Sequence, residues 1–253
     1  MHRLVLITIL LLLLVLPALG QSAQQQVMLG QKITSGAFTP TDIAGLKVWL
    51  KADALVLSDG DPVTTWADSS GSGNDATEAT FPPSYQTNEL NSKPIVRFDS
   101  GTLTRLTTAA FSAELTQPTT HFIVVKSLAD NNHFITDGIS GTKRNTFYKK
   151  TGSFNNSIFA GTAEINNSNW GTASYFYASI YFDGASSELF KNGVSDASGN
   201  PGTNGLTGLT IGADFAVTIF GSLDCAEILI YDTRLSLANR QLVEGYLATK
   251  YGL

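Results

Sequence analysis

The chain has 253 residues, of which 43% are hydrophobic, and its formal net charge is −5 at pH 7. This acidic balance excludes a protein that binds nucleic acid through a basic surface, because such a surface must neutralise phosphates. Cys225 is the single cysteine, which excludes an internal disulfide framework. A hydrophobic core must therefore stabilise the fold, and the length suits one large β domain.

Residues 1–20 have the pattern of a secretory signal peptide. Arg3 precedes an apolar run that ends at Leu16, Pro17 follows, and Ala18 and Gly20 place small residues at the −3 and −1 positions. The apolar run is shorter than the ~20 residues that a bilayer span needs. We predict cleavage after Gly20 and a secreted protein, at the cell surface, in the periplasm or in the medium, with no membrane span after cleavage; an uncleaved anchor is the alternative.

Residues 21–40 begin with a polar, glutamine-rich stretch without periodicity, which predicts a disordered leader. A β domain is predicted from 41 to 253. In most of this region, short β-branched or aromatic runs alternate with clusters of Gly, Ser, Asn, Asp and Thr. That alternation is typical of a sandwich or barrel with many short strands.

Seven strands are the clearest, and the pattern of one of them has two interpretations. The predicted strands are 46–51, 95–98, 120–126, 174–182, 188–191, 209–211 and 224–231. In 174–182, one face is formed by Phe176, Ala178, Ile180 and Phe182, and the other by Tyr175, Tyr177, Ser179 and Tyr181. The tyrosine-rich face is either a ligand surface or, as we favour, amphipathic packing under a loop.

Turn and cap residues complete the predicted fold. Asp183-Gly184 and Asn192-Gly193 tolerate positive φ and predict turns between antiparallel strands. At the C-terminus the apolar period changes to that of a helix, with Ser236 as its N-cap and Gly252 after its last turn.

Segments at both ends of the predicted domain resemble a known superfamily. They are GLKVWLKA at 45–52, VTTWADSSG at 63–71, AEILIY at 226–231 and GYLATKYG at 245–252. They are similar to the concanavalin A-like lectins and glucanases, specifically laminin-G-like jelly-roll domains. The resemblance implies an all-β, two-sheet antiparallel jelly-roll sandwich with one C-terminal helix, in which a concave sheet holds a glycan or a protein loop. Trp49, Trp66 and Asp68 are interpreted as structural residues, two core anchors and a turn cap.

The residues do not support an enzyme. Glucanases of the superfamily carry a Glu-x-Asp-x-(x)-Glu strand, which this chain lacks. Asp224 and Glu227 are three residues apart, and strand alternation predicts that they point to opposite faces. His121 and His133 have no acidic or cysteine neighbour at a ligand spacing, whereas catalytic zinc needs three convergent ligands.

Calcium is the one cofactor with a candidate site. Asp59 and Asp61 flank Gly60 and offer hard oxygen ligands in a turn. The alternative is a pair of solvated turn aspartates.

Two segments combine aromatic side chains, interpreted as exposed, with amides that suit sugar hydroxyls. The ligand-binding candidates are Tyr148, Phe154, Asn155, Asn156, Asn169 and Trp170. A ring face stacks on a sugar while the neighbouring amides bind its hydroxyl groups. Ordinary loop sequence with half-buried rings is the alternative interpretation.

We therefore predict a secreted, non-catalytic carbohydrate-binding or adhesion module whose partner is a glycan or another cell-surface ligand. The alternative is a structural surface or virion subunit whose jelly roll contacts copies of itself or a neighbouring structural protein. A divergent glycan-cleaving enzyme is the third hypothesis, because the fold alone does not decide function.

Overall fold

The computed structural model describes residues 37–129, 133–149, 155–166, 168–172 and 174–253. Phe38–Leu253 forms a compact unit, which begins three residues before the predicted domain. The predicted signal peptide and residues 21–36 of the predicted leader lie outside the described residues, so both remain predictions. In the described ranges, no helix is long and apolar enough to cross a membrane.

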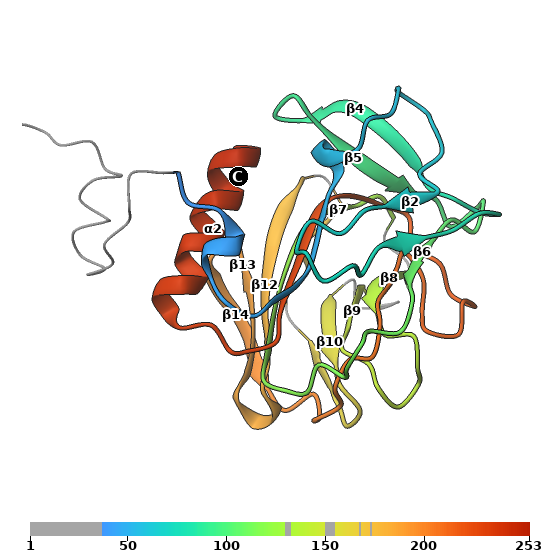
Figure 1. Cartoon of the computed structure of the whole chain (residues 1–253). Helices are drawn as coiled ribbons and strands as arrows, with labels where there is room; N and C mark the ends of the chain where they lie inside the picture. Colours follow the sequence, from blue (N-terminus) through green and yellow to red (C-terminus); the bar gives the residue numbers. More distant parts are fainter. Residues whose placement is uncertain (1–36, 130–132, 150–154, 167, 173) are drawn as a thin grey trace, which may run out of the picture. The chain divides into compact units, whose positions relative to one another are not determined.

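The compact unit is built from two antiparallel sheets and a C-terminal helix (Figure 1). Sheet A has the order β14-β13-β12-β7-β16-β5-β4, and β1 also pairs with β16. Its strands are β1 (Leu46–Lys51), β4 (Ser84–Leu90), β5 (Lys93–Phe98), β7 (Thr119–Ser127), β12 (Phe176–Phe182), β13 (Ser187–Lys191), β14 (Val194–Gly199) and β16 (Leu223–Tyr231). This arrangement confirms the predicted all-β sandwich.

Sheet B has the order β11-β10-β9-β8-β15-β6-β3-β2. Its strands are β2 (Thr65–Trp66), β3 (Ala76–Thr77), β6 (Leu106–Thr108), β8 (His133–Asp137), β9 (Thr146–Lys149), β10 (Asn156–Phe159), β11 (Glu164–Asn166) and β15 (Thr210–Ile211). The helical elements are η1 (Pro40–Asp42), η2 (Ala52–Ala54), η3 (Gly184–Ser186) and α2 (Leu237–Tyr251).

The structure confirms all seven predicted strands, with ends that differ by at most two residues. Strands β12 and β13 pair antiparallel on either side of Asp183-Gly184, as the predicted turn there requires. Asn192 and Gly193 adopt φ angles of 48° and 79° in the turn to β14, as their residue types predict. Ser236 caps α2 by accepting a hydrogen bond from the Asn239 amide, and Gly252 ends the helix at φ 70°.

The main core lies between the sheets. One face of β12 contributes Phe176, Ala178, Ile180 and Phe182, and sheet B contributes Phe147 and Ile158 among others. Trp66 is fully buried there, as predicted for a core anchor. Cys225 is also buried, and burial raises the pKa of its thiol, which disfavours the reactive thiolate.

A second apolar cluster joins the outer face of sheet A to α2. Tyr177 and Tyr181 of β12 pack there with Val243 and Leu247 of the helix. The Tyr181 hydroxyl donates to the Leu235 carbonyl at 3.0 Å. The tyrosine-rich face of β12 is therefore a packing surface, covered by α2 rather than by a loop (Figure 1). It is the outer face of sheet B that no helix in the described part of the chain covers.

Because His121 is buried, we predict that the free energy of unfolding falls in acid. Its Nε2 lies 3.1 Å from the Thr119 hydroxyl, and burial lowers the pKa of His121 to about 3. In the unfolded chain the pKa is near 6.5, so below that pH the unfolded state binds more protons. The contribution of His121 to the free energy of unfolding is complete above pH 6.5 and falls by about 1.4 kcal/mol per pH unit toward pH 3.

Urea denaturation at several pH values between 7 and 4 measures this slope. His121→Gln, which does not titrate, should flatten it by about 1 kcal/mol or more per unit relative to the wild type. Equal slopes in the two proteins would contradict the assignment.

Candidate functional site

The outer face of sheet B carries a group of aromatic side chains. Phe147 of β9 and Ile158 of β10 belong to the core, so their strand neighbours Tyr148 and Phe159 point the other way. Phe134 of β8 pairs with Tyr148, and the two rings stack with centroids 5.2 Å apart and an interplanar angle of 16°. Three adjacent strands thus place aromatic rings side by side on this face.

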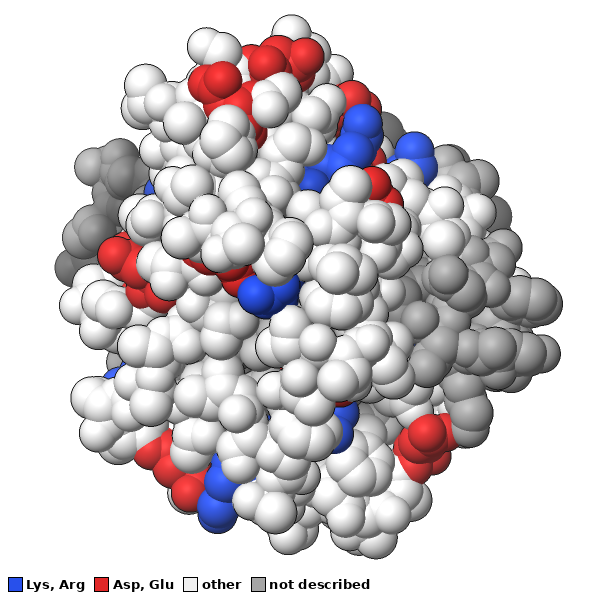
Figure 2. Space-filling model, turned by 90° about the vertical axis from the view of Figure 1, so that its right-hand side faces the viewer, with Lys and Arg blue, Asp and Glu red and all other residues white. Residues whose placement is uncertain are grey.

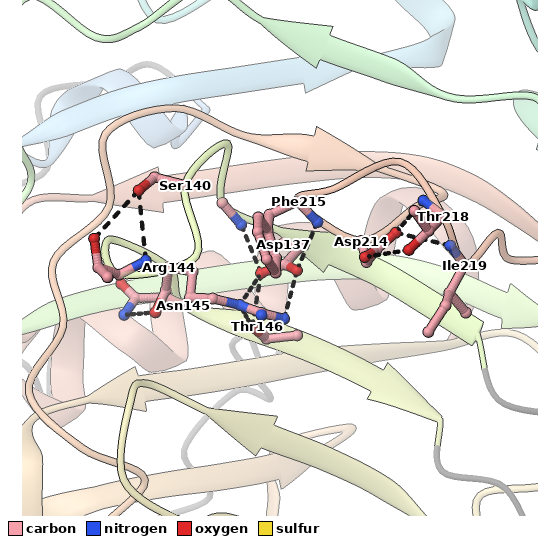
Figure 3. Close-up of polar contacts among 11 residues, drawn as sticks. Asp137, Ser140, Arg144, Asn145, Thr146, Asp214, Phe215, Thr218 and Ile219 are labelled. Atoms are coloured by element: carbon pink, nitrogen blue, oxygen red, sulfur yellow. Dashed lines mark hydrogen bonds and ion pairs between the residues drawn. The ribbon is translucent and has the colours of Figure 1, made fainter.

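Beside these rings lies a buried ion pair (Figure 3). Arg144 donates from Nε to Asp137 Oδ1 at 2.9 Å and from Nη2 to Oδ2 at 2.6 Å. Asp137 also accepts from the Thr146 hydroxyl and from the backbone amides of Gly138 and Phe215. Burial raises the pKa of Asp137, against the opposing effect of Arg144 and these hydrogen bonds. The bidentate geometry holds the guanidinium in one orientation.

Aromatic rings surround the guanidinium group. The Arg144 Cζ lies 4.6 Å from the ring centroid of Phe215, 5.5 Å from that of Phe159 and 5.8 Å from that of Phe134. Phe215 is 36% exposed, whereas Arg144 itself is largely buried. Nη1 has no hydrogen-bond partner within the described ranges. The site therefore presents a fixed, unused donor next to an accessible ring.

Two loops are shaped to form this arrangement. The loop after β8 turns closely at Gly138, where an added Cβ atom would lie 2.6 Å from the Lys143 carbonyl oxygen. In the second loop, Asp214 Oδ1 accepts from the backbone amides of Thr218 and Ile219 at 2.6 and 2.8 Å (Figure 3). This turn fixes the position of Phe215, whose amide joins the two loops through Asp137.

Further polar groups extend across the same face. Ser157 of β10 donates to Asn166 of β11 at 2.7 Å, and both Asn166 and Glu164 are exposed. Burial raises the pKa of Tyr148 most, and the nearby Glu164 carboxylate raises it further. Figure 2 shows the side on which β2, β6 and β8 lie, and most of its described surface carries no charged side chain. The face thus combines rings with polar groups, of which Glu164 is charged.

The first group of predicted ligand residues lies on or near β9 and β10. Tyr148 is only 7% exposed, so the expectation of an exposed loop ring is wrong: 146–149 is a strand of sheet B. Asn156 lies two residues before Ile158 on the same face of β10, so it points toward the core. Neither of its amide atoms has a hydrogen-bond partner among the described residues. Asn155 is half-buried, and Phe154 lies outside the described residues.

The second group, Asn169 and Trp170, is on the opposite side of sheet B. Trp170 is 5% exposed, and its ring packs against Phe176 and Phe147 of the core, so its predicted exposure is also wrong. Asn169 is exposed. Both residues line a pocket of about 290 Å³, the corner pocket, which is formed by Ser168, Asn169, Trp170, Lys191, Asn192, Val194, Ser195 and Asp196. The two predicted groups therefore belong to two places, not to one site.

The candidate calcium residues each bind backbone amides. Asp59 Oδ1 accepts from the Thr87 amide at 2.8 Å, and the hydrogen bonds from Thr87 lower the pKa of Asp59. Asp61 Oδ2 accepts from the Ser58 amide at 2.7 Å. In the part of the chain that the structure describes, no group of three or more His, Cys, Asp or Glu side chains is placed to hold a metal ion. Calcium binding by Asp59 and Asp61 remains a prediction.

The inference that Asp224 and Glu227 point to opposite faces is wrong. Strand β16 has a register irregularity between Cys225 and Glu227, and an inserted residue reverses the alternation. Both carboxylates therefore lie on the outer face of sheet A. Asp224 is bound by Arg97 and by the Tyr175 hydroxyl, and Glu227 by residues of β1 and α2. Neither carboxylate is accessible, because their side chains are 1% and 0% exposed.

Sequence reasoning did not identify Asp137, Arg144, Phe215 or Lys191 as site residues. Asp137 and Arg144 are seven residues apart across a loop, and Phe215 comes from a distant loop. No periodicity or short motif marks such a set. The Asp137-Gly138 pair is a turn signal, but it indicates only that the chain reverses there.

Comparison with known proteins shows the fold. No family model and no curated relative matches the sequence. Among solved structures, domain 4 of AbnA, a GH43 extracellular arabinanase from Geobacillus stearothermophilus in complex with arabinotriose, is 14% identical with a TM-score of 0.57. The match covers 79% of this chain and 97% of that domain.

Larger proteins contain similar domains. The receptor-binding domain of botulinum neurotoxin C/D mosaic serotype is 12% identical, with a TM-score of 0.61, over 81% of this chain and 52% of that one. Trypanosoma rangeli sialidase in complex with the inhibitor DANA is 14% identical, with a TM-score of 0.58, over 90% of this chain and 38% of that one. This chain thus spans about half or less of these two proteins. At such identities the likeness shows a shared β-sandwich fold.

Proposed function

We propose that this protein is an extracellular, non-catalytic carbohydrate-binding module of the concanavalin A-like, laminin-G-like kind, and that the outer face of sheet B binds a neutral saccharide. The observation that carries the proposal is Arg144: its guanidinium is held by a buried carboxylate, is bordered by three aromatic rings and has no hydrogen bond from Nη1 to any described residue. A sugar offers both matching features, since its hydroxyl oxygens accept hydrogen bonds and its C–H faces pack on rings.

The ligand class follows from the charges of the pair. Arg144 and Asp137 cancel each other, so the site offers an oriented donor without net attraction for an anion. Most of the described surface in Figure 2 carries no charged side chain, and Glu164 beside Tyr148 adds a negative charge, so these surroundings add no strong attraction for an anion. Asp137 accepts from five donor atoms and is fully buried, which suits a positioning role rather than proton transfer to a ligand.

The similar structures support the proposal at the level of fold. Domain 4 of AbnA is described as a domain of an extracellular arabinanase in complex with arabinotriose, and it is matched over nearly its whole length. A β-sandwich of this kind therefore holds a short neutral saccharide in at least one protein.

The test is calorimetric titration of the protein with arabinotriose and with other neutral oligosaccharides selected on a glycan array. We expect saturable binding to at least one of them. Phe215→Ala should weaken binding about 2- to 10-fold, because a stacked ring contributes about 0.5–1.5 kcal/mol. Arg144→Met should weaken it further by removing the donor.

Phe81→Ala is the matched control. Phe81 is 39% exposed and lies 5.2 Å from the Arg105 guanidinium, an environment similar to that of Phe215. Its removal should leave the affinity unchanged. Equal losses in the Phe81 and Phe215 variants, or no binding to any neutral saccharide, would overturn the proposal.

A further inference from the structure

The corner pocket lies where the segment before β12 meets the β13–β14 hairpin. Its volume of about 290 Å³ is near the lower end of the range for small-molecule sites, which leaves room for one small polar group. It shares no lining residue with the aromatic face of sheet B. Its side-chain carboxylate and amide oxygens have hydrogen-bond partners, whereas some of its donors make no hydrogen bond to any described residue.

The acceptors of the pocket already have partners. Asp196 Oδ2 accepts from the Trp170 indole N–H at 2.7 Å and from the Ser168 amide at 3.1 Å, and its Oδ1 accepts from the Ser168 hydroxyl at 2.8 Å. The side-chain oxygens of Asn169 and Asn192 accept from the backbone amides of Gly171 and Tyr177 at 2.7 and 2.9 Å. These bonds also decide which side-chain atom of each asparagine is the nitrogen.

Donors on three side chains of the pocket, in contrast, remain available. The Nδ2 groups of Asn169 and Asn192 make no hydrogen bond to any described residue. The Lys191 ammonium group has three donors, of which one makes a long 3.5 Å hydrogen bond to the Trp170 carbonyl. Lys191 forms no ion pair within the part of the chain that is described.

Lys191 is also held in an apolar setting. Its Nζ lies 5.7 Å from the ring centroid of Trp170 and 5.5 Å from that of Phe176. Burial lowers the pKa of Lys191, and the nearby Asp196 opposes this effect. A partly desolvated cation with unused donors is stabilised most by an anionic acceptor, because charge-assisted hydrogen bonds are about twice as strong as neutral ones.

We propose that the corner pocket binds a carboxylate group presented by an acidic saccharide, with Lys191 as the charge partner and the amide nitrogens of Asn169 and Asn192 as additional donors. Asp196 also lines the pocket, but its oxygens accept from Trp170 and Ser168. A carboxylate supplies two further acceptor oxygens and a negative charge for the donors of Lys191, whereas a hydroxyl supplies no charge. The saccharide part of the proposal rests on the proposed carbohydrate-binding function. The carboxylate part rests on the pocket alone.

The test is an NMR titration that follows the indole N–H signal of Trp170. This N–H donates to Asp196 inside the pocket, so a ligand there shifts its resonance. D-glucuronate should shift the signal saturably, and D-glucose, the neutral analogue, should bind at least about tenfold more weakly. Lys191→Met keeps most of the side chain and its ring contacts but should remove the response, whereas Lys191→Arg should retain it.

Lys93→Met is the matched control. It removes one positive charge from β5, toward the opposite edge of sheet A from β13, and should leave the titration unchanged. Equal affinities for glucuronate and glucose, or an unchanged response in Lys191→Met, would overturn the proposal. Binding of acetate as tight as that of glucuronate would overturn the saccharide part.

The readout also separates this site from the aromatic face. Neutral saccharides that bind beside Phe215 act on the other side of sheet B, so loss of that binding in Phe215→Ala should leave the Trp170 titration unchanged. Failure of the neutral-saccharide test combined with a normal glucuronate titration would contradict only the proposal for the aromatic face.

Discussion

Replacement of Glu227 by alanine is expected to lower the free energy of unfolding by about 3–5 kcal/mol, because it removes one partner of a buried, charged network. The Glu227 carboxylate is fully buried on β16. It accepts from the Trp49 indole N–H, from the hydroxyls of Tyr246 and Tyr251, and from the Lys250 ammonium at 2.8 Å. Three of these donors belong to the last turns of α2, so the carboxylate attaches the helix to sheet A.

Urea denaturation monitored by tryptophan fluorescence measures this effect. Glu114→Ala is the control, because Glu114 also pairs with a lysine, Lys143 at 2.8 Å, but on the exposed surface. Exposed pairs contribute about 0–1 kcal/mol, so the control should change little. A loss in Glu227→Ala no greater than in Glu114→Ala would show that the network does not hold the helix.

The second large effect is expected at the buried pair of the aromatic face. Asp137→Ala leaves the largely buried Arg144 without its counter-charge and removes the acceptor for the Thr146 hydroxyl and for two backbone amides. We expect a loss of about 3–5 kcal/mol in the free energy of unfolding. Binding of neutral saccharides should also be lost, because Arg144 is no longer held in position.

A double-mutant cycle distinguishes the pair from its general surroundings. Asp137→Asn combined with Arg144→Met should be more stable than the sum of the two single losses predicts, since no buried charge remains unpaired. Asp183→Ala, which breaks the half-exposed pair with Arg234 at 3.1 Å, should change the stability by less than about 1 kcal/mol. If the losses in the free energy of unfolding of the two single variants simply add up in the double variant, the two residues are not a coupled ion pair.

Sheet A and the helix could be predicted from the sequence because their signals are local. Strands β7, β12 and β16 are long and rich in β-branched or aromatic residues, and β12 alternates clearly between core side chains and tyrosines. The ends of α2 are marked by the N-cap Ser236 and by Gly252. Strand alternation and helix caps depend on residues close together in the sequence, so they leave a recognisable pattern there.

Sheet B was largely missed, although it carries the aromatic face. Its strands have two to five residues, and segments such as Thr146–Lys149 and Glu164–Asn166 are too short and polar to show alternation. The same limit explains the errors for Tyr148 and Trp170. Two lysines follow Tyr148 and polar residues flank Trp170, yet both rings are buried and pack against Phe134 and Phe147 of other segments. Amide and aromatic composition alone does not indicate which side chains reach the surface.

The sequence by itself therefore determined the fold class, six of the eight strands of the helix-covered sheet and the terminal caps. It also determined the structural roles of Trp66 and Asp68, whose carboxylate binds the backbone amides of Trp49, Ser70 and Asn74. The tertiary structure decided which residues meet: Asp137 with Arg144 and Phe215, Lys191 with Trp170, and the two carboxylates of β16 on one face. The physical reason is that strand pairing and a single β-bulge decide which way each side chain points, and both depend on partners far along the chain.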